Sequence, residues 1–279
     1  MAPKSPMLLV TDLDGTLLDH HNYQWQAAEP ALALAKSHEI PIIFNSSKTL
    51  AECRLIQWQL NLQGPIIFEN GAGVALPRSI WPETGPSHLD QSFADEFWVK
   101  ALAVDYAQIT EVLQRLRHKH SFRFRGFGDM SVTEISEHTG LSQQGAANAK
   151  RREFSEPLIW QDTDRRFAEF THALQPEGLT QARSGRFIQI MGPADKGTAM
   201  LWLADRYSAP RPRLLALGDS DNDIPMLSNA DLAVIVRSPA HDLPVFQESQ
   251  QPSRVMVTDE CGPLGWNRAV LKILEETEM

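Results

Sequence analysis

Asp12-Leu13-Asp14-Gly15-Thr16-Leu17 follows directly after the apolar run Met7–Val10. A short apolar run of this kind predicts a strand that is buried on both faces, as in a parallel sheet. Ligands of open α/β sheets bind outside the carboxyl ends of the strands, so Asp12 and Asp14 are expected to project into a site. Two neighbouring carboxylates repel each other, and a hard divalent ion such as Mg²⁺ relieves that repulsion because it prefers oxygen ligands.

Five further short apolar runs end in polar or glycine-containing turns. Helix-like stretches lie between the early runs, at Trp25–His38 and Thr49–Leu60. Strands that alternate with helices are typical of an α/β fold, and we predict a doubly wound, Rossmann-like parallel sheet. The further predicted strands are Pro41–Phe44, Pro65–Phe68, Leu214–Leu217, Leu232–Val236 and Arg254–Val257.

The middle of the chain, from about Pro86 to Met191, is more polar than either end. Helices are predicted near Asp105–Arg117 and Thr163–Leu174, and a hairpin is predicted over Gln181–Met191 with its turn at Ser184-Gly185. We interpret this segment as an inserted α+β cap domain. The predicted division is a discontinuous catalytic core of residues 1–85 and 192–279, and a cap of residues 86–191.

A second acidic stretch, Gly218-Asp219-Ser220-Asp221-Asn222-Asp223, also follows an apolar run. A calcium-binding EF-hand loop begins with similar acidic spacing. That loop requires glycine at its sixth position and glutamate at its twelfth, where this chain has Ile224 and Ala230. We therefore expect these carboxylates to converge with Asp12 and Asp14 on one metal ion.

Two weaker signals complete the set. Asn45-Ser46-Ser47-Lys48-Thr49 follows the predicted strand Pro41–Phe44, and hydroxyls with backbone N–H groups at a helix N-terminus can hold a phosphate. Ser46 or Ser47 could equally be a simple helix cap. Lys196 lies in Asp195-Lys196-Gly197, before the helix-like stretch Thr198–Tyr207. A lone lysine is usually solvated, but the other signals require a cation for the phosphate.

These four signals, in this order, resemble the motifs of the haloacid dehalogenase superfamily of phosphohydrolases. The long insert between the serine and the lysine is similar to the C2-type cap of that superfamily. The resemblance implies a magnesium-dependent phosphatase that forms an aspartyl-phosphate. One departure is Asp221, where the family often has proline. The implied roles are Asp12 as nucleophile, Asp14 as general acid and base, Ser46 and Lys196 as phosphoryl ligands, Asp12, Asp14 (through its backbone carbonyl) and Asp219 as Mg²⁺ ligands, and Asn222 and Asp223 around the metal.

Further stretches across the chain resemble the mannosyl-3-phosphoglycerate phosphatases. They are Ser46–Thr49, Glu69–Ala72, Phe124–Met130, Thr139–Leu141, Arg151–Pro157 and Ser184–Phe187. The resemblance implies hydrolysis of 2-O-(α-mannosyl)-3-phosphoglycerate. Arginine can hold the carboxylate of that substrate in bidentate fashion, although Arg152 and Glu153 could instead form a surface ion pair. Glu69 and Asn70 could bind the substrate or stabilise their own loop. The predicted substrate-binding residues are Ser47, Lys48, Thr49, Glu69, Asn70, Arg152, Glu153 and Arg186.

Composition and charge narrow the range of partners. The chain has 279 residues, of which 42% are hydrophobic, and its formal net charge is -9. An acidic protein repels nucleic acid, and no apolar stretch approaches the length of a membrane span, so we expect a small-molecule substrate. The apolar run Met7–Val10 is too short for a signal peptide, and there are only two cysteines, so we expect a cytoplasmic enzyme. The alternatives are a phosphatase for glucosyl-3-phosphoglycerate, sucrose phosphate or another sugar phosphate, and a catalytically silent binding protein.

Overall fold

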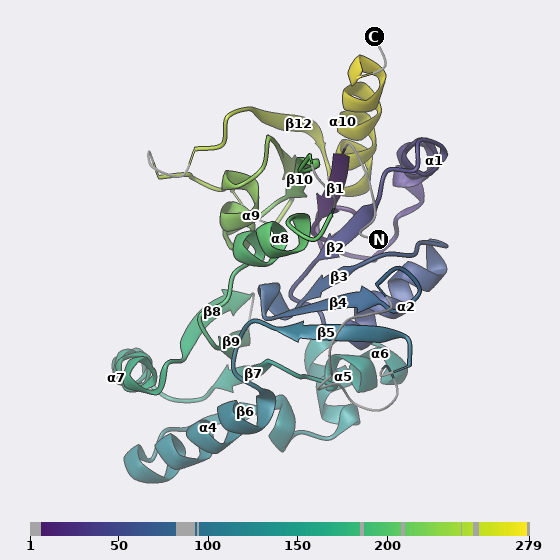
Figure 1. Cartoon of the computed structure of the whole chain (residues 1–279). Helices are drawn as coiled ribbons and strands as arrows, with labels where there is room; N and C mark the ends of the chain where they lie inside the picture. The colour runs from purple at the N-terminus through teal and green to yellow at the C-terminus, as the bar shows by residue number, and fades with distance from the viewer. Residues whose placement is uncertain are drawn as a thin grey trace.

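A computed structural model describes residues 7–81, 93, 95–184, 187–207, 210–240, 242–247 and 251–277. Its strands form two sheets, an eight-stranded large sheet and a four-stranded small sheet (Figure 1). The large sheet has the order β12-β11-β10-β1-β2-β3-β4-β5. Its strands are β1 (Met7–Thr11), β2 (Ile42–Asn45), β3 (Ile66–Phe68), β4 (Gly73–Pro77), β5 (Phe97–Ala101), β10 (Arg213–Gly218), β11 (Leu232–Arg237) and β12 (Val255–Cys261).

The predicted parallel strands are confirmed. The strand β1 lies between β10 and β2 and pairs with both in parallel. Successive side chains of β1 enter different clusters: Leu9 lies in one hydrophobic core and Leu8 in the other, and both are fully buried. A strand that is buried on both faces is the reason the stretch Met7–Val10 is apolar without alternation.

Helices cover both faces of the large sheet, which confirms the doubly wound architecture. The first core packs between the sheet and α1 (Glu29–Ser37), α2 (Leu50–Gln59) and α10 (Gly262–Thr277). The second core packs between the sheet and α8 (Lys196–Ala204) and α9 (Ile224–Ser228). Within the described part of the chain, no helix combines the length and the apolar character that crossing a membrane requires.

The large sheet is parallel only as far as β3, since β4 and β5 run antiparallel to their neighbours. The chain reverses between β3 and β4 in the short turn η2 (Glu69–Gly71), where Asn70 has a positive φ of 58°. So short a connection can join only antiparallel strands. The strand β5 belongs to the large sheet, although it falls inside the segment 86–191 that we predicted as the cap. Its alternating Phe97 and Val99 pack on the first core.

The small sheet has the order β6-β7-β9-β8 and is antiparallel throughout. Helices α4 and α7 pack on one face, and α5 and α6 form a separate cluster with Phe127. The predicted helices near Asp105–Arg117 and Thr163–Leu174 and the predicted hairpin are confirmed, while Gly185 of its turn lies outside the described residues. The elements are α4 (Tyr106–His120), β6 (Phe124–Gly126), α5 (Val132–Thr139), α6 (Gln143–Ala149), β7 (Ser155–Trp160), α7 (Asp164–Leu174), β8 (Thr180–Ser184) and β9 (Phe187–Met191), with the short 3₁₀ turns η1 (Gln26–Ala28), η3 (Phe127–Asp129), η4 (Gln175–Glu177) and η5 (Asp221–Asp223).

Candidate active site

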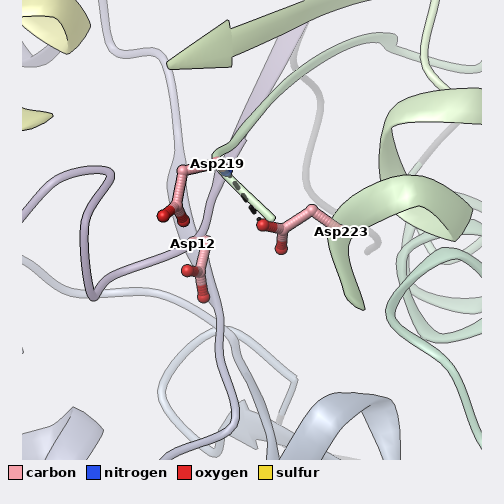
Figure 2. Close-up of side chains that lie close together, drawn as sticks. All are labelled: Asp12, Asp219 and Asp223. Atoms are coloured by element: carbon pink, nitrogen blue, oxygen red, sulfur yellow. Dashed lines mark hydrogen bonds between the residues drawn. The ribbon is translucent and has the colours of Figure 1, made fainter. Parts of the chain in front are cut away.

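Three buried carboxylates meet at the carboxyl ends of two neighbouring strands. Asp12 follows β1, and Asp219 and Asp223 follow β10. Carboxylate oxygens of these three residues all lie within 4.8 Å of one another. Figure 2 shows the carboxylates of Asp12 and Asp219 side by side, with Asp223 turned toward them from the next turn of chain. The parallel pairing of β1 with β10 brings the two acidic stretches together.

Local hydrogen bonds fix the second acidic stretch. The Oδ2 atom of Asp223 accepts from the backbone N–H groups of Asp219 (3.0 Å) and Ser220 (3.1 Å). The hydroxyl of Thr16 donates to Oδ1 of Asp219 at 3.0 Å. Gly15 has a φ of 80°, and a Cβ atom there would lie 2.5 Å from the Asp219 carboxylate. The glycine therefore serves both the turn and the close approach of the two loops.

Lys196 is the positive charge of this cluster. Its Nζ atom lies 2.7 Å from Oδ1 of Asp12 and 2.6 Å from Oδ1 of Asp223, and its side chain is fully buried. Burial alone would lower the pKa of Lys196, but the two carboxylates outweigh burial and raise the pKa above its usual value. The side-chain amide of Asn45 donates to the backbone carbonyl of Lys196 at 2.9 Å, and Asp195 caps the helix that Lys196 begins.

The cluster has the chemistry of a divalent-metal site. It holds three buried carboxylates and one lysine, which leaves an excess of negative charge. Burial raises the pKa of Asp12 well above its usual value, and the carboxylates of Asp223 and Asp219 add to this, while Lys196 opposes it. A divalent cation would offset the excess charge and favour the ionised form of Asp12. The three carboxylates can therefore hold such an ion.

A cavity of about 190 Å³ lies between the large-sheet loops and the small sheet. Asp14 forms part of its wall and pairs with Lys48, whose Nζ atom lies 2.8 Å from Oδ2 of Asp14. The other carboxylate oxygen, Oδ1 of Asp14, is buried without a hydrogen-bond partner. Asp12 and Asp14 thus face different neighbours, one the cluster and the other the cavity. The remaining lining residues are Tyr23, Ser47, Glu52, Phe127, His138, Thr139, Leu141, Ala149, Arg152, Pro157, Phe187 and Gln189.

The stretch after β2 has divided roles. Thr49 caps α2 in a capping box with Glu52, and its hydroxyl also donates to the backbone carbonyl of Asn148 at 3.0 Å. The helix cap is therefore Thr49, and neither Ser46 nor Ser47 fills that place. Ser46 is 1% exposed, and its hydroxyl oxygen accepts from the backbone N–H of Lys48 at 3.3 Å. Of these residues, Ser47 and Lys48 line the cavity and Ser46 and Thr49 do not.

Glu69 connects the large sheet to the small sheet. It is fully buried, and its carboxylate accepts from the backbone N–H groups of Glu153 (2.9 Å) and Phe154 (3.0 Å) and from the hydroxyl of Ser155 (2.5 Å). Burial raises the pKa of Glu69, while the charge of Arg152 and these hydrogen bonds oppose the rise. Of the two interpretations of Glu69, these contacts match the hydrogen-bonding role, which extends here to the strand β7.

Asn70 also spans the two sheets. Its amide nitrogen donates to Oε1 of Gln189 at 2.8 Å, and its amide oxygen accepts from Asn222 at 3.1 Å. Asn222 thus lies against Asn70 at the edge of the carboxylate cluster. The neighbouring Asp221 is exposed to solvent, so the departure from the family motif at this position adds a charge outside the buried cluster.

The predicted small-sheet residues fall in different places. Arg152 lines the cavity, and its Nη1 atom donates to the backbone carbonyl of Ser47 at 3.0 Å. Glu153 lines a different, larger cavity beside the start of α4. Arg186 lies outside the described residues. The structure therefore brings Arg152 to the site and places Glu153 elsewhere.

Several residues of the site were not predicted from the sequence. Asp223 was expected only around the metal, yet its carboxylate is one of the three that converge. Tyr23, His138 and Gln189 line the cavity and carry no local motif. Thr139 and Leu141 stood in a stretch quoted for the resemblance, but their position in the wall follows from the packing of α5 and α6. No signal within the sequence itself singles out Gln189.

Comparisons with known proteins agree with this fold. The family model described as haloacid dehalogenase-like hydrolase matches residues 9–95 and 128–243. The fold is similar to that of the protein TM0651 from Thermotoga maritima, with a TM-score of 0.65, 18% identity and coverage of 98% of this chain and 97% of that one. The fold is also similar to that of the phosphatase BT1666 from Bacteroides thetaiotaomicron, with a TM-score of 0.62, 19% identity and coverage of 99% of this chain and 98% of that one.

A third similar structure is the sucrose-phosphatase from Synechocystis sp. PCC6803, solved with sucrose and phosphate. Its TM-score is 0.59 at 17% identity, with coverage of 96% of this chain and 97% of that one. These likenesses concern the fold, whereas the family match spans both acidic stretches, Lys196 and most of the segment between them. The chain therefore belongs to the haloacid dehalogenase-like hydrolases.

Proposed function

We propose that the chain is a Mg²⁺-dependent phosphatase that hydrolyses 2-O-(α-mannosyl)-3-phosphoglycerate to mannosylglycerate and phosphate. The observation that carries the phosphatase proposal is the meeting of three buried carboxylates with a buried lysine beside a cavity. Carboxylates alone would repel a phosphate ester, so Lys196 and a divalent cation are needed to attract it.

In the first step, Asp12 acts as the nucleophile. One of its carboxylate oxygens forms a bond to phosphorus while the bond from phosphorus to the leaving oxygen breaks, which gives an aspartyl-phosphate. Asp14 donates a proton to the leaving oxygen, and its place in the wall of the cavity supports this role. Lys196 and Ser46 bind phosphoryl oxygens, where negative charge must be stabilised.

In the second step, the aspartyl-phosphate is hydrolysed. Asp14 takes a proton from a water molecule, the water oxygen attacks phosphorus, and the bond to Asp12 breaks, so that phosphate leaves and Asp12 is regenerated. When bound, Mg²⁺ would be held by Asp12, Asp219 and the backbone carbonyl of Asp14, with Asp223 and Asn222 around it, and it supplies charge that shields the nucleophile from the phosphate.

The substrate is proposed from the stretches that resemble the mannosyl-3-phosphoglycerate phosphatases and from Arg152. Arg152 lines the cavity, and a guanidinium group can pair with the carboxylate of a glycerate. We also propose that the small sheet with its helices is a cap that closes over the cavity and excludes water, while β5 remains with the core. Sucrose phosphate is the second candidate substrate, because the fold is similar to that of a sucrose-phosphatase.

The test is a panel of phosphate esters assayed for phosphate release with Mg²⁺ and with a chelator. The panel contains mannosyl- and glucosyl-3-phosphoglycerate, sucrose phosphate and a simple sugar phosphate. We expect the highest kcat/KM for mannosyl-3-phosphoglycerate and a loss of about a hundredfold or more without metal. Similar rates for all esters would contradict a dedicated substrate, and undiminished rates in chelator would contradict the metal.

Two variants of one loop provide a matched pair for the metal. Asp219→Asn weakens a buried carboxylate of the cluster, so activity should fall by about a hundredfold at limiting Mg²⁺. Asp221→Asn removes the same charge two residues away, where the side chain is exposed, and should change activity less than about twofold. Equal losses in both variants would show that net charge of the loop, and not metal ligation, is responsible.

A further inference from the structure

Four hydrogen bonds join five polar side chains in one directed series, which begins at the edge of the carboxylate cluster and passes the wall of the cavity. The series begins at Asn222, which donates to Asn70 at 3.1 Å, and Asn70 donates to Gln189 at 2.8 Å. Gln189 in turn donates to the hydroxyl oxygen of Ser155 at 3.3 Å, and this hydroxyl donates to the carboxylate of Glu69. Every bond of the series runs in the same sense.

The carboxylate of Glu69 fixes the direction of the series. An ionised carboxylate carries no hydrogen, so the hydroxyl of Ser155 must donate to it. The hydroxyl oxygen in turn accepts from Gln189 and, at 3.4 Å, from Arg152. The amide nitrogen of Gln189 therefore points to Ser155, and its amide oxygen is taken by the N–H of Asn70. Neither amide can turn over without breaking two hydrogen bonds.

Gln189 is left with one N–H that is not used by the protein. An amide nitrogen carries two hydrogens, and within the described ranges only Ser155 accepts from this one. The side chain is 4% exposed, so it is nearly withdrawn from solvent, yet it lines the 190 Å³ cavity. A spare donor on a buried residue that lines a cavity favours a ligand with an acceptor at that place.

In the proposed mechanism, the cavity holds the leaving group and not the phosphate. Asp12 and Lys196, which would hold the phosphoryl group, do not line it, whereas Asp14, which would protonate the leaving oxygen, does. Arg152 stands in the same wall and is a donor only. Arg152 and Gln189 thus both offer hydrogens to the cavity, and the polar His138 and Thr139 and the apolar Phe127 and Phe187 complete this wall.

We propose that Gln189 is a specificity-determining residue that donates a hydrogen bond to a hydroxyl or carboxylate oxygen of the leaving group, and that Asn70 is the positioning residue that fixes its orientation. This inference rests on the proposed phosphatase function. The Gln189 side chain would select oxygen-rich leaving groups over leaving groups without a hydrogen-bond acceptor.

The experiment compares two substrates in matched variants. One substrate is the panel ester with the highest kcat/KM, and the other is phenyl phosphate, whose leaving group has no acceptor beyond the ester oxygen. Gln189→Met keeps the length of the side chain and removes the donor. We expect its KM for the panel ester to rise about fivefold to tenfold, with kcat and the KM for phenyl phosphate within about twofold of wild type.

Asn70→Gly tests the positioning role. Asn70 has a φ of 58°, which glycine adopts without strain, so this variant removes both amide bonds and leaves the backbone free to keep its turn. A rotating Gln189 should still donate part of the time, so the KM for the panel ester should rise by about threefold. The control is Gln143→Met, an exposed glutamine of α6 outside the cavity, for which no change is expected.

Binding measurements separate failure of this inference from failure of the proposed function. Calorimetry in the Asp12→Asn background gives dissociation constants of both esters without turnover, with and without Gln189→Met. A wild-type protein that hydrolyses no ester contradicts the function, but a selective loss of binding for the oxygen-rich ester still supports Gln189. Equal losses for both esters, or none, in KM and in dissociation constant overturn the inference.

Discussion

The two walls of the site are built in different ways. On the large-sheet side, the carboxylates come from two short acidic stretches that follow neighbouring strands, and Asp223 is held by the N–H groups of Asp219 and Ser220 in its own loop. On the small-sheet side, the cavity wall consists of single residues from different elements, such as Phe127, Arg152 and Gln189. The comparison indicates that short motifs encode the chemistry, whereas recognition depends on how distant segments pack.

The largest expected effect is on the turnover rate, and it comes from the carboxylates on the large-sheet side, which we call the chemical wall. Asp12→Asn removes the nucleophile and keeps the volume of the side chain, so kcat should fall about ten-thousandfold or more. Steady-state phosphate release measures this loss. Binding of the substrate should persist, and Asp221→Asn serves as the control for a changed charge nearby. A residual rate within about tenfold of wild type would contradict the role of Asp12.

The second prediction concerns the small sheet away from the cavity. Glu156 is 3% exposed, and burial raises its pKa to about 7, although hydrogen bonds from Gly128 and Tyr106 oppose the rise. Charged groups that act on it are Arg152, which lowers the pKa, and Asp129, which raises it. Between about pH 4.5 and 7 the folded state therefore binds more protons than the unfolded state, and stability falls as pH rises.

Glu156→Gln should abolish this dependence. The stability of wild type relative to the variant should decrease by about 2–3 kcal/mol at most between pH 4.5 and 7, and level off above that range. Urea unfolding at a series of pH values measures the difference. If the free energies of unfolding of the two proteins change with pH in the same way, the prediction is refuted. It is also refuted if the variant gains stability relative to wild type as the pH falls.

The third prediction tests the connection between the two walls. Glu69→Gln replaces one buried carboxylate oxygen with an NH₂ group, which then faces a backbone N–H group and cannot accept from it. The free energy of unfolding should therefore drop by about 1–3 kcal/mol. The matched control is Glu39→Gln. Glu39 has a φ of 55°, close to the 49° of Glu69, but its side chain is exposed. If both variants lose stability equally, backbone conformation and not the buried contacts accounts for the loss.

The smallest effect in this series is on substrate binding, and it comes from the small-sheet side of the cavity. Arg152→Ala should raise the KM for the preferred ester by about tenfold and leave kcat within a few-fold, because Arg152 would bind ground state and transition state alike. Arg151→Ala changes the neighbouring residue, which does not line the cavity, and should leave KM unchanged. An unchanged KM in Arg152→Ala would remove this residue from the set of substrate ligands.

Local patterns predicted the parallel part of the large sheet and the meeting of the two acidic stretches. The expected convergence of every carboxylate was wrong in two places, because Asp14 lines the cavity beside Lys48 and Asp221 is exposed. Met7–Val10 and Leu214–Leu217 are apolar because their strands are buried on both faces, and each is followed by its acidic turn. The antiparallel edge was not predicted, because β5 depends on its pairing with β4 across a long connection. Gln189 was missed for a similar reason, since its role depends on Asn70 and Ser155, 119 and 34 residues away.

The pairing of β1 with β10 has a consequence for synthesis on the ribosome. The partner strand of β1 ends at Gly218, and the hydroxyl of Thr16 reaches Asp219 across 203 residues of chain. While the polypeptide emerges, β1 can meet β2 early, but its other edge must wait until more than three quarters of the chain has been translated. An incomplete product that lacks β10 would therefore leave Asp12 without the opposite half of its charge cluster, so a truncated chain cannot consume phosphorylated metabolites.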